Sequence, residues 1–167
     1  MPITPFHFGP GAALHALAPR HVSFIAFCAA NVLIDFESLY NLVNRRSQVH
    51  AFFHTYVGAT LVALAVIGIF ATLRGLSARV RLPDPLRWKE LTYRQVVIGS
   101  ALGAYSHVAL DSLMHRDITP FMPMTTENTL LGLVSLSALH WSCVAAGLVG
   151  ALGVGIRRLL AGASSAA

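Results

Sequence analysis

The stretch FFHTYVGATLVALAVIGIFATL, residues 52–73, decides the fold class of this chain. It contains no Asp, Glu, Lys or Arg, and about 20 apolar residues suffice to cross the roughly 30 Å hydrocarbon core of a bilayer. Because backbone groups in lipid must be satisfied within their own segment, a helix is the state expected for it. The sequence therefore predicts a membrane-spanning helix here.

The composition of the whole chain agrees with this interpretation. Of its 167 residues 55% are hydrophobic and only 11% are charged, whereas a soluble domain has about 45–50% and about 25%. These values exclude an ordinary soluble domain, a disordered chain and a coiled coil. We expect one membrane-embedded helical domain over residues 1–160 and a flexible tail over residues 161–167.

Other apolar segments flank this one, at residues 22–43, 96–113 and 130–156. Near the start, GPGAALHALAPR (residues 9–20) is too short to span; it predicts a helix of two or three turns ended by Pro19. This helix either lies flat in the interface or forms a hairpin with the following segment. The prediction is an all-α polytopic integral membrane protein with about four apolar helices and a short N-terminal helix.

The basic residues predict the orientation of the helices. The formal charge is +5. The basic residues are not interleaved with aromatic residues, so the sequence does not predict a nucleic-acid partner. Nine of the 12 Lys and Arg residues can share one side, namely Arg20, the six in residues 74–94, Arg157 and Arg158; Arg45, Arg46 and Arg116 fall on the other. The positive-inside rule then places the long loop in the cytoplasm. We expect a multi-pass protein of a bacterial inner membrane, with lipids as partners and an undetermined oligomeric state.

Several ionisable residues lie within or beside the apolar segments, all towards the opposite, periplasmic face. They are Asp35, Glu37, His50, His54, His107, Asp111 and Asp117. A charge at mid-bilayer costs about 2.5–3.5 kcal/mol on insertion scales, so such residues normally face a partner or a polar cavity. Their accumulation near one face predicts a site.

The spacing of these residues favours metal binding. His50 and His54, like His107 and Asp111, are four residues apart and are expected on one face of a helix, a common arrangement of metal ligands. Asp35 and Glu37 are two apart and point to different faces, so Asp35 is the preferred ligand. His7 joins them if the N-terminal hairpin forms. The candidate ligands are His7, Asp35, His50, His54, His107 and Asp111, for a divalent metal that is zinc first, with manganese or iron also admitted.

Four motifs resemble the YdjM-type family of predicted bacterial membrane-bound metal-dependent hydrolases. They are TPFHFGPG at residues 4–11, LIDFE at 33–37, HAFFHT at 50–55 and GAYSHVALD at 103–111. That family is considered distantly similar to zinc-dependent phospholipase C and to fungal single-strand nucleases. The resemblance implies ligands at His7, Asp35, His54, His107 and Asp111, with Glu37 at the family's second acidic position. The family's middle motif differs here, because its Arg and Gly are absent and its two His are four residues apart instead of five.

The function expected from these features is hydrolysis of a phosphoester, with a phospholipid among the candidate substrates, by metal-activated water. Glu37 or Asp117 is the candidate catalytic carboxylate that orients the water. One alternative is a divalent metal or proton transporter that uses the same residues as a pathway. Another is a catalytically inactive protein in which the metal supports the structure or binds a partner.

Overall fold

The structure is a computed structural model that describes residues 4–165, with side chains for residues 5–161, and every regular element in that range is helical. The elements are η1 (Thr4–His7), α1 (Phe8–Leu17), α2 (Phe24–Val43), η2 (Phe52–His54), α3 (Tyr56–Ser77), η3 (Trp88–Glu90), α4 (Tyr93–Ser112) and α5 (Leu136–Ser165). The all-α prediction is confirmed. α5 continues as a helix through residues 161–165, which the sequence had assigned to the tail.

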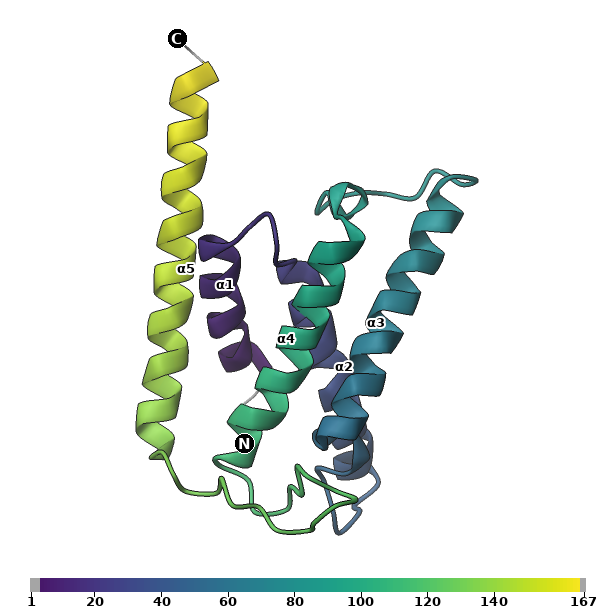
Figure 1. The fold of residues 1–167 in the computed structure, drawn as a ribbon, viewed down its shortest axis with the longest axis vertical. Helices are drawn as coiled ribbons and strands as arrows, with labels where there is room; N and C mark the ends of the chain where they lie inside the picture. The colour runs from purple at the N-terminus through teal and green to yellow at the C-terminus, as the bar shows by residue number, and fades with distance from the viewer. Residues whose placement is uncertain (1–3, 166–167) are drawn as a thin grey trace.

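Helix α4 lies at the centre of the bundle (Figure 1). It packs against both α2 and α3, while α1 packs mainly along α5. The loop of residues 78–92 closes one end of the bundle, which we call the basic-loop end. The loops of residues 44–55 and 113–135 close the other end.

The number of candidate spans is smaller than the sequence predicted. Within the described residues, three helices are long and apolar enough to cross a membrane: α2, α3 and α5 up to Ala161. The remaining predicted segment, residues 96–113, forms most of α4, and α4 is not among these three helices. The physical reason is that α4 buries small and polar residues such as Ser100, His107 and Asp111 against its neighbours. Because these residues face α2 and α3, the buried side of α4 does not need to be apolar, while Val97 and Leu102 lie on its exposed side.

Local capping moves the start of the second apolar segment. The Thr55 side chain accepts a hydrogen bond from Gly58 N and caps α3, so the α-helix begins at Tyr56. Phe52–His54 form the separate 3-10 turn η2, and His50 precedes it in a bend. The expectation that His50 and His54 share one face of an α-helix is therefore wrong. Their rings nevertheless lie 4.8 Å apart between centroids.

Helices α2 and α4 run in the same direction, and their contact positions keep a constant register of 76 residues. A Cβ atom on Gly99 would meet the backbone of Ser23, and one on Gly103 would meet the backbone of Phe27. Small residues at this i, i+4 spacing allow close approach of two helices. Continued by four residues at a time, the same register brings His107 to Asn31 and then Asp111 to Asp35.

The N-terminal helix forms a hairpin with α2, which is one of the two arrangements that the sequence left open. The chain reverses over residues 18–23 (Figure 1), where Pro19 O accepts a hydrogen bond from the Gln95 side chain. Ser23 then caps α2 by accepting from Ala26 N. This reversal returns His7, at the end of η1, to the level of α2 at which Asp35 lies.

Candidate metal centre

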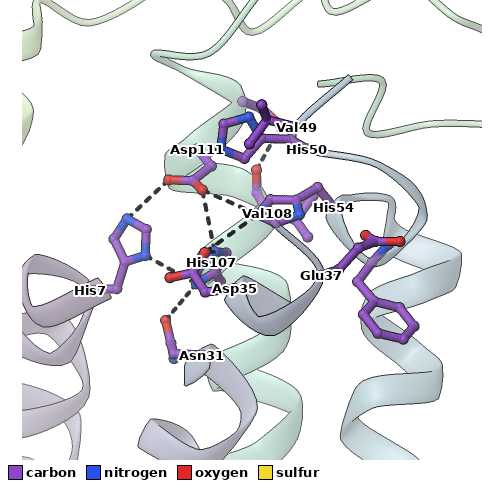
Figure 2. A network of polar contacts seen from close by, with 12 residues as sticks. His7, Asn31, Asp35, Glu37, Val49, His50, His54, His107, Val108 and Asp111 are labelled. Carbon is purple, nitrogen blue, oxygen red and sulfur yellow. Dashed lines mark hydrogen bonds and ion pairs between the residues drawn. The ribbon is translucent and has the colours of Figure 1, made fainter. Parts of the chain in front are cut away.

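Four donor atoms from three parts of the chain meet at the end of the bundle away from the basic loop (Figure 2). His107 Nε2 lies 3.2 Å from Asp111 Oδ2 and 3.3 Å from Asp35 Oδ1. His54 Nε2 lies 3.5 Å from Asp111 Oδ2 and 3.7 Å from Asp35 Oδ1. We call Asp35, His54, His107 and Asp111 the four-donor group. Its donors all lie within 4.8 Å of one another, so this group can hold a metal ion.

Burial makes the four-donor group costly without a cation. His54 and His107 are fully buried and Asp111 is 3% exposed. Among the described residues, the buried atoms that lack a well-aligned hydrogen bond include His54 Nε2, His107 Nε2 and Asp111 Oδ1, whose close contacts are ion pairs within this cluster. A buried polar atom without a hydrogen bond costs about 1–3 kcal/mol, and an ion is one partner that can satisfy such atoms.

The charge balance at His54 points the same way. Burial disfavours the charged form of its imidazole, but the carboxylates of Asp111 and Asp35 outweigh burial, so the pKa of His54 is raised. The group therefore attracts positive charge. A bound dication would supply that charge in place of protons on imidazole nitrogens.

Asn31 fixes the orientation of one ligand. Its Nδ2 donates to Phe27 O at 2.8 Å and to Gly103 O at 3.3 Å, which turns its Oδ1 towards His107. The His107 Nδ1 lies 2.9 Å from that oxygen. When Nδ1–H donates to that oxygen, Nε2 carries no proton, and its lone pair points towards Asp35 and Asp111. Metal-bound histidines usually have such a hydrogen bond at the nitrogen that does not bind the metal.

His7 touches the other side of the centre. Its Nε2 lies 3.1 Å from Asp111 Oδ1, and its Nδ1 lies 3.1 Å from His107 Nδ1. It is 2% exposed. The structure therefore brings His7 against two members of the four-donor group without placing it among the four donors themselves (Figure 2).

His50 lies beside the group and belongs to a second set of donors. His50, Asp111 and His115 also offer ligand atoms within 4.8 Å of one another, and we call them the three-donor group. The His50 and His115 rings stack with centroids 4.2 Å apart. Burial lowers the pKa of His115, and the nearby His50 lowers it further. The charges of Asp111 and Asp117 act in the opposite direction but are outweighed.

The two candidate catalytic carboxylates have structural partners. Glu37 Oε2 accepts a hydrogen bond from Phe53 N at 2.7 Å and thereby holds η2 against α2. Asp117 accepts from His50 N at 3.1 Å and lies 2.9 Å from His50 Nδ1. Burial acts to raise the pKa of Asp117, but these contacts with His50 outweigh it and lower the pKa. Both carboxylates thus position the histidine-bearing loop.

Sequence reasoning missed Asn31 and His115 as members of the site. Both carried a usable signal, since Asn31 is four residues before Asp35 and His115 is four residues after Asp111. Glu37 lies on another side of the continuous helix α2 from Asp35, as the two-residue spacing predicted (Figure 2).

Comparisons with protein-family models, with curated proteins and with solved structures gave no match. The assignment of this centre therefore rests on the chemistry and geometry of its own residues.

Proposed function

We propose that this protein is a membrane-bound metal-dependent hydrolase of a phosphoester. One observation carries the proposal: four of the six donor–donor distances in the four-donor group match the edges of a tetrahedral zinc site. Donors that each lie 2.0–2.2 Å from a tetrahedral zinc are about 3.3–3.6 Å apart. Four edges of this group measure 3.2–3.7 Å. Two imidazoles and two carboxylates suit zinc first, and manganese or iron also accept this mixed set.

The chemistry follows from what a dication does to water. A bound dication lowers the pKa of water enough to supply hydroxide near neutral pH. The hydroxide oxygen would bond to phosphorus, the ester P–O bond would break, and the proton given up by the water would pass to the departing oxygen. The Asp35 side chain is 28% exposed, unlike the buried donors around it, so water and an ester would approach beside Asp35.

The location of the centre supports a membrane-bound enzyme. Three described helices are apolar enough to span, and the centre lies at one end of the bundle, beside the loops (Figure 1). The opposite half of the α2–α3–α4 core is apolar and includes Val66, Phe70 and Val96. A transport pathway needs polar groups at several depths, so this distribution favours a site over a conduit. We propose that the centre faces the periplasm of a bacterial inner membrane, because the positive-inside rule puts the basic-loop end in the cytoplasm.

A structural metal site is the second candidate function. Structural zinc sites are closed by four protein ligands, whereas catalytic sites keep a position for water. The four protein ligands are the observation that favours this second candidate, whereas the hydrolase requires water as a fifth ligand of the ion.

Metal analysis joined to an activity assay tests the proposal. The detergent-purified chain should contain zinc or another divalent metal, and His107→Ala should lose it. Hydrolysis of phospholipids or aryl phosphates should disappear with the metal and return when it is added back. His21→Ala is the matched control, because His21 is exposed and belongs to neither donor group. A stoichiometric metal without hydrolysis of any ester would assign the structural function instead.

A further inference from the structure

The three-donor group is built around a carboxylate that the four-donor group also uses. His50, Asp111 and His115 come from the bend before η2, the last turn of α4 and the turn after it. Asp111 is the one residue common to both groups. A carboxylate has two oxygens with several lone pairs, so one Asp can serve two cations.

Asp117 prepares His50 as a ligand. The His50 Nδ1 lies 2.9 Å from both carboxylate oxygens of Asp117, and the backbone N–H of His50 donates to the same carboxylate. Nδ1 therefore carries the ring proton, which leaves a lone pair on Nε2. A carboxylate behind the far nitrogen is the usual support of a metal-bound histidine.

His115 is held in place by the turn that follows α4. Its backbone N–H donates to Asp111 O at 2.8 Å, which continues the helical spacing by one turn. The Asn128 side chain donates to Ser112 O and to His115 O. These bonds keep the His115 ring beside His50 and Asp111.

We infer that the three-donor group binds a second divalent cation and that the Asp111 carboxylate bridges it to the cation of the four-donor group. This inference rests on the proposed function, because Asp111 must ligate the first ion. Paired metal ions about 3.5–4 Å apart stabilise both the attacking and the leaving oxygen of a phosphoester. The two ligand carboxylates, Asp35 and Asp111, carry two negative charges against the four positive charges of two dications, and the remaining positive charge among the ligands favours an anionic ester over a neutral one.

Metal stoichiometry of the full chain in detergent tests the inference. After removal of metals and equilibration with Zn²⁺ alone, the wild type should bind two ions per chain by mass spectrometry. His115→Ala and His50→Ala should each bind one, and the control His21→Ala should bind two. With Mn²⁺ alone, the wild type should give the electron paramagnetic resonance signal of an exchange-coupled pair, and His115→Ala that of an isolated ion.

A milder variant protects the test against misfolding. Asp117 is partly exposed, so Asp117→Asn should fold, weaken the second ion by about 10–100-fold and leave the first unchanged. One zinc per wild-type chain, unaltered by His115→Ala and Asp117→Asn, would overturn the second ion while the proposed function stood. So would two ions that all three variants retain. No bound metal in the wild type would overturn both.

Discussion

The two ends of the α2–α4 pair share one register but differ in what the register brings together. Towards the basic-loop end, Gly99 and Gly103 face the backbone of α2 directly. Towards the other end, the same positions carry His107 and Asp111, which face Asn31 and Asp35. The difference teaches that close packing at one end sets the spacing of the donors at the other. Substituting one residue at each end in turn can separate the effect of helix packing from the effect of the donor atoms.

The largest effect is expected from a substitution at the end that carries the donors. Asp111→Asn keeps the size of the side chain but removes the charge that both donor groups share. The variant should insert and purify as the wild type does, because Gly99 and Gly103 are untouched. Its affinity for Zn²⁺ should fall by at least about 100-fold, the upper range for losses even outside the ligand shell.

Calorimetric titration of Zn²⁺ into the metal-free chain measures this affinity, and esterase activity should fall in parallel. Activity that survives both Asp111→Asn and thorough chelation would show that the proposed hydrolase chemistry does not use this centre.

The next largest effect is expected from a substitution at the basic-loop end, where glycines pack against α2. A Cβ at position 103 would overlap the Phe27 backbone, so Gly103→Ala must force α2 and α4 apart. Overpacking of this kind costs about 1–3 kcal/mol. We expect a lower Tm together with weaker zinc binding, although no donor is altered.

Gly68→Ala is the matched control for this variant. It lies within α3, where an added Cβ meets nothing within 4 Å, and alanine favours a helix by up to about 1 kcal/mol over glycine. Its Tm should stay level or rise, with zinc binding unchanged. Equal behaviour of the two glycine variants would break the link between packing and donor spacing.

A smaller effect is expected midway between the two ends. Asn31 orients the His107 ring without being a donor itself. Asn31→Leu keeps the branched shape of the side chain but removes the acceptor for Nδ1–H, so zinc affinity should fall by about 10-fold. The Tm should fall as well, because the buried His107 N–H loses its partner. Ser100→Ala is the control, because among the described residues this buried hydroxyl donates to Val97 O within α4 and contacts no donor of the centre. If both variants bind zinc as the wild type does, Asn31 has no positioning role.

The sequence predicted much of the fold because the apolar segments exceed or approach the length of a span. Helices α2, α3 and α5 overlap the predicted segments, and Asp35, His54, His107 and Asp111 meet in space. Local spacing identified His107 and Asp111, which one helix presents together. It could not show that α4 buries its polar side against α2 and α3, since that depends on the arrangement of its neighbours.

Other features depended on contacts between distant segments. His50 reaches the centre from an irregular bend that is fixed by Asp117, 67 residues later in the chain. The hairpin that returns His7 carries a hydrogen bond from Gln95 to Pro19, 76 residues earlier in the chain. Periodicity within one segment carries no information about such contacts, so helical spacing gave the wrong local structure for residues 50–54.

The last prediction concerns the orientation of the two ends and leaves stability and metal binding unchanged. Ala78 and Thr126 are exposed and lie in loops at opposite ends of the bundle (Figure 1). Nine Lys and Arg residues were assigned to the basic-loop side and three to the other, so the positive-inside rule puts residue 78 in the cytoplasm. In a background with Cys28 and Cys143 replaced by Ala, a membrane-impermeant maleimide added to intact cells should label Thr126→Cys but not Ala78→Cys. Permeabilised cells should allow labelling of both, which controls for reactivity. The reverse pattern would place the metal centre on the cytoplasmic side, where any ester substrate would have to come from inside the cell.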